Sequence, residues 1–248
     1  MSKKIQELIL DLKNLQNKKQ AETSRRFFKT GLGEYGEGDI FWGIRVPVLR
    51  KVAQNYHYLK LDELKELLKN EVHEIRFIAI AILVEQYKVN YEIRDSAPRY
   101  KKAKKVEKNK IFNFYIKNSP LVNNWDLVDV SAPTIIGSHI YGLDKKILYT
   151  LWQKNNLWQK RIAIVANWYL IKKGELDDVF VLSLKAIHEN HDLLHKASGW
   201  MLREAGKINK DRLISFLKVN KNNMPRVMLR YAIERFSKEE RSVFLEKK

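Results

Sequence analysis

The sequence contains no cysteine, only 5 prolines and 10 glycines among 248 residues, and no long apolar run. The absence of cysteine excludes disulfides, thiolate nucleophiles and cysteine-bound zinc or iron–sulfur clusters. Because no run approaches 18 apolar residues, no transmembrane helix is expected. The segment Met1–Asp11 carries charges on both sides of a short apolar patch and lacks a small-residue cleavage site. It therefore predicts an amphipathic helix and not a signal peptide, and we expect a cytoplasmic protein.

Acidic residues are also scarce relative to basic ones. The chain has 29 Asp and Glu against 47 Lys and Arg, which gives a formal net charge of +18. A surplus of this size predicts attraction to polyanions, chiefly nucleic acid or an anionic membrane surface. The basic residues are spread along the chain and form no juxtamembrane cluster, so nucleic acid is the favoured partner.

Helical periodicity, in contrast, is abundant. Apolar residues recur three and four positions apart, first at Leu59, Leu61, Leu64, Leu67 and Leu68, and then at Ile75, Ile78, Ala79, Ile82 and Leu83. Such spacing is typical of amphipathic helices. No stretch alternates as a strand would and no βαβ pattern occurs, so we expect an all-α fold.

A weak repeat runs through this pattern, in which a basic residue precedes an apolar, small-residue helix. Successive spacings of 49, 36, 35 and 30 residues separate Arg76, Trp125, Arg161, Lys196 and Arg226. That range suits HEAT or armadillo helix pairs, which run to about 40 residues. We predict one HEAT-like domain over residues 1–248, built as a right-handed α-α superhelix. The second helix of each pair would line a concave, basic side.

The arginines of these repeats have an ordinary interpretation as well, because such residues often tie one repeat to the next through an acidic partner.

Two stretches interrupt the repeats. Residues Gly31–Gly43 contain five glycines and predict a loop. The basic run Arg99–Lys110 is expected to form a solvated helix or a phosphate-contacting edge, with the solvated face as the default.

Familiar cofactor and metal motifs are missing or out of context. Residues Gly31–Gly36 match G-x-G-x-x-G, but no strand precedes them, and Glu34, Glu37 and Asp39 would repel a pyrophosphate. There is no G-x-x-x-x-G-K-[ST] or H-E-x-x-H motif, and the six histidines are scattered. We therefore expect neither a nucleotide cofactor nor a metal.

The segment Asn123–Asp129, N-N-W-D-L-V-D, points to chemistry. Trp125 and Asp129 are four residues apart and share a helix face. Asn123 or Asn124 should cap this helix and put Asp126 in its first turn, near the positive end of the dipole. Pro133 should kink or end it.

A carboxylate beside an indole in a basic groove suits the removal of a nucleobase from deoxyribose. The carboxylate can stabilise an oxocarbenium-like sugar and orient the attacking water, and the indole can hold a cationic sugar or alkylated base. The alternative is a buried tryptophan with Asp129 in a structural salt bridge. From these residues alone, the structural alternative is preferred.

Four segments in order resemble the AlkC/AlkD family of DNA alkylation repair enzymes. Gly33–Arg50 resembles its N-terminal signature and Asn124–Pro133 its catalytic segment, while Leu157–Ala163 and Lys196–Glu204 are similar to its later repeats. The resemblance extends from about Ser24 to Phe236. It implies a monofunctional bacterial glycosylase of base excision repair. Such an enzyme hydrolyses the N-glycosidic bond of N3- and N7-alkylated purines, notably 3-methyladenine and 7-methylguanine, in double-stranded DNA.

The resemblance also implies roles for individual residues. Asp129 matches the family's catalytic aspartate, and Trp125 and Trp200 match its two active-site tryptophans. Arg161 matches its DNA-backbone arginine, and Lys160 and Arg203 are further candidate DNA contacts. Where some members use a tyrosine of an N-terminal helix, this chain has Arg-Phe-Phe-Lys at positions 26–29. With the resemblance, the catalytic interpretation of Asp129 is preferred.

The resemblance implies no metal and no cofactor, and we expect a monomer that joins the nucleoid through its DNA substrate. Two other functions compete with this one. A catalytically silent HEAT-like DNA-binding protein would keep the basic surface but lose the aspartate or the tryptophans, all of which are present. A protein-interaction scaffold would need no such surplus of positive charge.

Overall fold

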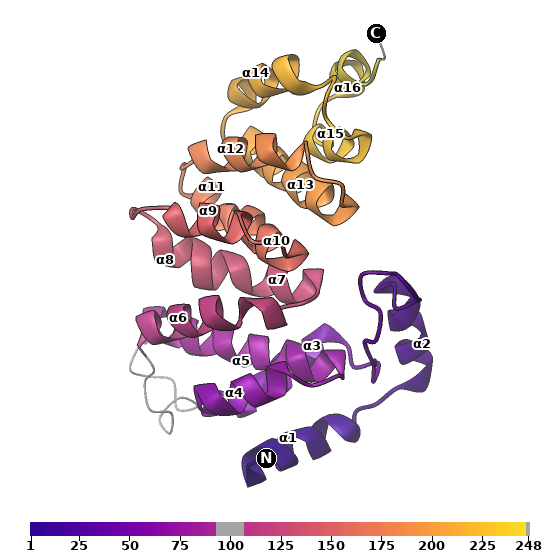
Figure 1. The fold of residues 1–248 in the computed structure, drawn as a ribbon, viewed down its shortest axis with the longest axis vertical. Helices are drawn as coiled ribbons and strands as arrows, with labels where there is room; N and C mark the ends of the chain where they lie inside the picture. Colours follow the sequence, from indigo (N-terminus) through magenta and orange to yellow (C-terminus); the bar gives the residue numbers. More distant parts are fainter. Residues whose placement is uncertain (93–106, 247–248) are drawn as a thin grey trace. The chain divides into compact units, whose positions relative to one another are not determined.

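A computed structural model describes residues 1–92 and 107–246 (Figure 1). Within these residues the regular elements are helices, and the only β-type contact is an isolated bridge between Ile40 and Val72. The all-α prediction is therefore confirmed. In this part of the chain no helix combines the length and apolar character needed to cross a membrane. Of the basic run predicted at Arg99–Lys110, residues 99–106 lie outside the described residues.

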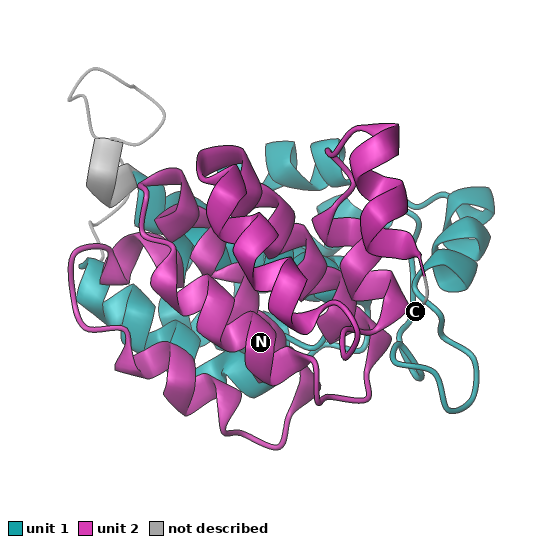
Figure 2. Ribbon diagram, turned by 90° about the horizontal axis from the view of Figure 1, so that it is seen from above, with its two compact units in different colours: residues 1–135 teal, residues 136–248 magenta. Residues whose placement is uncertain are grey.

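The chain divides into two compact units, Met1–Ile135 and Ile136–Lys248 (Figure 2). The first unit contains α1 (Lys3–Lys13), α2 (Lys18–Phe27), α3 (Val46–Asn55), α4 (Leu61–Leu68), α5 (His73–Glu92), α6 (Lys108–Asn118), the 3₁₀ turn η2 (Ser119–Leu121) and α7 (Trp125–Ala132). The π-helical turn η3 (Pro133–Gly137) follows α7 directly. The helices predicted around Leu59–Leu68 and Ile75–Leu83 correspond to α4 and α5.

The centre of the first unit is α5. Residues 72–84 are buried without interruption, so this helix is apolar around most of its circumference and not on one face only. The helices α3, α4, α6 and α7 all pack against it. The start of α5 therefore lies where several other segments converge.

The second unit is organised around α13. It contains α8 (Ser138–Ile140), α9 (Lys146–Trp152), α10 (Leu157–Val165), α11 (Asn167–Lys172), α12 (Asp177–Ala186), α13 (Asp192–Ile208), α14 (Lys210–Asn220), α15 (Arg226–Ala232) and α16 (Lys238–Leu245). The helices α10, α11, α12, α14 and α15 pack against α13.

The predicted repeat coincides with a succession of packed helices inside each unit. Its five marker positions fall within the first five residues of α5, α7, α10, α13 and α15. Of these helices, α5 packs on α7, and α13 packs on both α10 and α15, while α9 and α12 pair with α10 and α13. The helix-pair organisation is thus present within each unit. The prediction that residues 1–248 form one domain stays a prediction.

The glycine-rich segment predicted as a loop does connect α2 to α3, and the first turn of α5 holds its end. The buried Glu74 carboxylate accepts hydrogen bonds from the backbone N–H groups of Trp42, Gly43 and Ile44, at 3.0, 2.7 and 3.2 Å. The backbone of Ile40 also exchanges hydrogen bonds with Glu71 and His73. A buried carboxylate needs such donors, so Glu74 fixes the course of residues 40–44.

The same loop end also anchors α2. Gly43 has φ +76°, and a Cβ atom there would lie 2.2 Å from the carbonyl oxygen of Asn17 and 2.5 Å from the nitrogen of Ala21. The backbone N–H of Asn17 donates to the carbonyl of Trp42 at 2.9 Å. Only glycine permits both this backbone conformation and this close approach to the start of α2.

A second set of buried charges ties α5 to the loop and to α7. The guanidinium of Arg76 donates to Asp39 at 2.6 Å. The ring of His73 lies between two carboxylates, with Nε2 at 2.8 Å from Asp126 and Nδ1 at 3.4 Å from Asp39. Asn124 also donates to Asp39, at 3.2 Å.

These contacts determine the charge on His73. Burial alone would lower the pKa of His73, but the charge of Asp126 and the hydrogen bonds to Asp126 and Asp39 raise it to about 9. Burial likewise opposes ionisation of Asp39, but His73 and Arg76 outweigh it and hold the pKa of that carboxyl below its usual value. At neutral pH, His73 is therefore an imidazolium between two carboxylates.

Gly43→Ala should destabilise the protein more than Gly38→Ala. Both positions have positive φ, which costs a non-glycine residue about 1–2 kcal/mol. A Cβ at position 38 has no atom within 4 Å, whereas at position 43 it meets the backbone of α2 and adds roughly 1–3 kcal/mol of overpacking. Urea denaturation of the two variants measures the difference. Equal losses would contradict the close contact between Gly43 and α2.

The charge on His73 should make stability depend on pH. Because its pKa is raised from 6.5 to about 9, the stabilisation is complete below pH 6.5 and is lost as the pH rises through 9. The loss is on the order of 3 kcal/mol. Asp126→Asn removes the main cause of the raised pKa, so this variant should be less stable at pH 6.5 and lose less between pH 6.5 and 9. Urea midpoints of wild type and Asp126→Asn at the two pH values measure the difference. An equal loss of stability in both proteins between pH 6.5 and 9 would contradict a charged His73.

Candidate functional site

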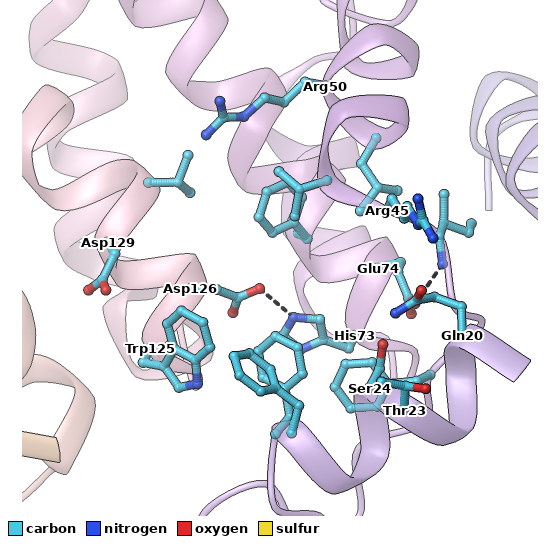
Figure 3. Close-up of a pocket in the computed structure, with 18 residues that line it drawn as sticks. Gln20, Thr23, Ser24, Arg45, Arg50, His73, Glu74, Trp125, Asp126 and Asp129 are labelled. Carbon is cyan, nitrogen blue, oxygen red and sulfur yellow. Dashed lines mark hydrogen bonds and ion pairs between the residues drawn. The ribbon is translucent and has the colours of Figure 1, made fainter. Parts of the chain in front are cut away.

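A pocket of about 580 Å³ opens in the first unit (Figure 3). Its walls come from α2, the start of α3, the first turns of α5 and the start of α7. Polar groups enter it from all four elements: Gln20, Thr23 and Ser24 from α2, Arg45 and Arg50 at the start of α3, His73 and Glu74 from α5, and Asp126 and Asp129 from α7. The buried contacts at the start of α5 thus lie directly behind this pocket.

The segment predicted to carry the chemistry has the predicted local structure. The side chain of Asn124 caps α7 by accepting a hydrogen bond from the backbone N–H of Trp125 at 2.8 Å. The helix ends at Ala132, directly before Pro133, as the proline predicts. Trp125 and Asp129 lie one turn apart on α7, are half-buried and line the same pocket.

The two carboxylates of α7 have different surroundings. Asp126 occupies the first turn as predicted, but its side chain also pairs with the buried His73 at 2.8 Å. Figure 3 shows the Asp126 carboxylate turned toward His73, with Asp129 apart from that ion pair. The negative charge of Asp126 is therefore balanced inside the protein, whereas Asp129 faces the pocket without a share in this pair.

Aromatic rings form one wall of the pocket. Phe28 stacks on Trp125 with ring centroids 5.1 Å apart and planes 13° apart, and Phe27 meets the same indole edge-on at 5.6 Å. On its other side, Phe28 lies 4.9 Å from Phe41 and 4.8 Å from the His73 ring. The charged His73 ring stacks on Phe41 at 4.7 Å, an arrangement that favours the cationic form.

Sequence reasoning missed these partners of Trp125. Phe27 and Phe28 were noted only because no tyrosine stands there, and His73 only as one of six scattered histidines. One signal was available for the phenylalanines. Only Ala21 is buried among the residues of the polar helix α2, so aromatics at its end need a partner outside the helix. No local pattern identifies His73, because its partners are 34 and 53 residues away.

The other predicted site residues belong to the second unit. Trp200 is half-buried on α13. Arg161 is 5% exposed and donates to the carbonyl of Leu193 at 2.7 Å, which links α10 to the start of α13. This geometry favours the structural interpretation of Arg161.

The two remaining basic candidates are also paired. Lys160 forms an ion pair with Glu189 at 2.6 Å, and Arg203 pairs with Glu204 and Glu234. Any DNA contact by these side chains would compete with those partners, and their DNA-binding roles stay predictions. Among the described residues there is no cluster of three or more His, Cys, Asp or Glu suited to a metal ion.

Comparison with known proteins agrees with the resemblance seen in the sequence. The family model described as DNA alkylation repair enzyme matches residues 8–236. The structure of a predicted DNA alkylation repair enzyme from Enterococcus faecalis is similar, with a TM-score of 0.66 and 16% identity over 90% of this chain and 97% of that one. At that identity the likeness concerns the fold, and no curated protein matches significantly. Because the family match covers most of the sequence, the chain belongs to the DNA alkylation repair enzyme family.

Proposed function

We propose that this protein is a monofunctional alkylpurine DNA glycosylase. It would hydrolyse the N-glycosidic bond of N3- and N7-alkylated purines, such as 3-methyladenine and 7-methylguanine, in double-stranded DNA. The observation that carries this proposal is the position of Asp129 in the pocket, one helical turn from Trp125, while the neighbouring Asp126 is paired with His73. Of the two carboxylates on α7, we assign the substrate to Asp129, which lines the pocket outside the His73–Asp126 pair.

The proposed reaction needs little assistance at the leaving base. Alkylation at N3 or N7 gives the purine a positive charge, so the base departs as a neutral molecule with the electron pair of the broken C1′–N bond. The sugar then carries the developing positive charge. The Asp129 carboxylate stabilises this oxocarbenium-like sugar and accepts a hydrogen bond from the attacking water. The water oxygen bonds to C1′ and passes its proton to the Asp129 carboxylate, which releases it to solvent, and an abasic site is left.

The aromatic wall would serve the same transition state. An indole face attracts a cation by about 0.5–2 kcal/mol, more where water is excluded. Trp125 is held against Phe28 at 5.1 Å and against Phe27 at 5.6 Å, so its ring is already oriented before substrate arrives. Trp200 of the second unit is proposed as the second tryptophan of the site.

Water is the only co-reactant in this scheme, and no cofactor or metal is proposed. The partner is double-stranded DNA containing alkylated purines, which the net charge of +18 attracts. We propose a monomer that acts on chromosomal DNA in the bacterial cytoplasm. The competing function is a catalytically silent DNA-binding protein of the same family.

Asp129→Asn should abolish most base release and retain DNA binding. Loss of one preorganised charge at a developing cation should lower the single-turnover rate by roughly 10²–10³-fold or more. The assay measures methylated purines released from alkylated duplex DNA. The control is Asp62→Asn, which makes the same change on an exposed residue of α4 away from the pocket, and should release base at the wild-type rate.

The outcomes of this assay are separable. Release by Asp129→Asn at the wild-type rate would contradict the catalytic role of the aspartate. An unfolded Asp129→Asn protein would show that the residue is structural. If neither folded protein releases base while both bind DNA, the silent DNA-binding function replaces the glycosylase.

Trp125→Ala should reduce base release less than Asp129→Asn, by roughly two- to thirtyfold, because it removes a cation–π contact of about 0.5–2 kcal/mol. Trp200→Ala should have an effect of similar size. Single-turnover rates on the same alkylated duplex measure both. A Trp125→Ala loss as large as that of Asp129→Asn would mean that the indole does more than attract the cation.

A further inference from the structure

Two arginines in the pocket have no partner within the part of the chain that the structure describes. Arg45, the N-cap residue of α3, and Arg50, on that helix, both line the pocket and are both exposed. Neither guanidinium takes part in an ion pair or hydrogen bond with another described residue, and Figure 3 shows both beside the cavity. An unpaired guanidinium carries five donors and a permanent charge, so both side chains can accept an anionic ligand.

Four other basic side chains of the protein differ in this respect. Arg76 and Arg161 are buried and donate to groups of the protein itself. Lys160 and Arg203 form ion pairs with glutamates. Each of these side chains would have to give up a partner to contact a ligand. Arg45 and Arg50 have no such partner among the described residues to give up.

The acidic groups of the pocket are largely balanced without these arginines. Glu74 receives three backbone N–H groups, and Asp126 pairs with His73. The side chains of Gln20 and Ser24 also line the pocket, from α2, and form no hydrogen bonds with the described residues. The side of the pocket between α2 and α3 is therefore positive and rich in donors, whereas Asp129 lies on the α7 side.

We propose that Arg45 and Arg50 form a phosphodiester-binding site for the DNA strand that carries the damaged base. This phosphate site rests on the proposed function, because the anion it would bind is the DNA substrate. Guanidinium groups bind phosphate oxygens through paired, charge-assisted hydrogen bonds. Five residues of helix rise by about 7.5 Å, so the two arginines can follow successive phosphates along one strand. These contacts would set the strand so that its sugar faces Asp129 and Trp125.

Salt-dependent binding to an undamaged duplex tests this site without requiring catalysis. Each lost phosphate contact should make the negative slope of log affinity against log salt less steep by about 0.9, so Arg45→Gln/Arg50→Gln should make it less steep by about 1.8. Affinity should fall roughly tenfold for each arginine, by the same factor on undamaged and alkylated duplexes.

The matched control is Lys51→Gln. Lys51 is exposed, adjoins Arg50 on α3 and does not line the pocket. It should leave the slope within about 0.3 of wild type, well under one contact. An unchanged slope in the double variant, or an equal loss in Lys51→Gln, would overturn the phosphate site. A circular dichroism melt confirms that each variant is folded.

The phosphate site and the glycosylase can fail separately. A less steep slope in the double variant together with no base release by wild type would retain the phosphate site and reject the glycosylase. Normal base release by wild type together with an unchanged slope in the double variant would retain the glycosylase and reject the phosphate site. In the expected case, Arg45→Gln/Arg50→Gln loses release mainly through weaker binding, and saturating concentrations of protein recover most of the single-turnover rate.

Discussion

The first turn of α5 buries three ionisable side chains, and each is satisfied by a different part of the chain. Glu74 receives the N–H groups of residues 42–44, Arg76 pairs with Asp39, and His73 pairs with Asp126 of α7. Removing one partner of a buried charge pair costs about 3–5 kcal/mol, so none of these segments can move away while the first unit remains folded. The course of the glycine loop and the start of α7 follow from this requirement.

The pocket depends on the same contacts. Trp125 precedes the residue that pairs with His73, and Phe28 is packed between the rings of Trp125 and His73. The orientation of the indole is therefore set before any substrate binds, as a preorganised site requires. Of the two carboxylates three residues apart on α7, Asp126 pairs with the buried His73, and Asp129 lines the pocket outside this pair.

Local rules predicted the elements of this fold better than their connections. Periodicity identified α4 and α5. Capping preferences left Asn123 and Asn124 as candidates, of which Asn124 caps α7, and Pro133 marks the change from α7 to the π-helical turn η3. Helical spacing placed Trp125 and Asp129 on one face, and the family resemblance implied catalytic roles for them that stay predictions. The partners of His73 could not be found in this way, because pairing across 34 and 53 residues leaves no periodic trace. Net charge predicted a polyanion, but it could not separate arginines held by the protein from arginines exposed to solvent.

The helix α2 contrasts with α5 in how it is held. Only Ala21 of α2 is buried, and its attachment consists mainly of the backbone contacts around Gly43 and the rings at its C-terminal end. A helix with so little apolar burial has a low free energy of local opening, far below that of the apolar α5. The amide hydrogens of α2 should therefore exchange faster than those of α5, because opening α2 exposes much less apolar surface.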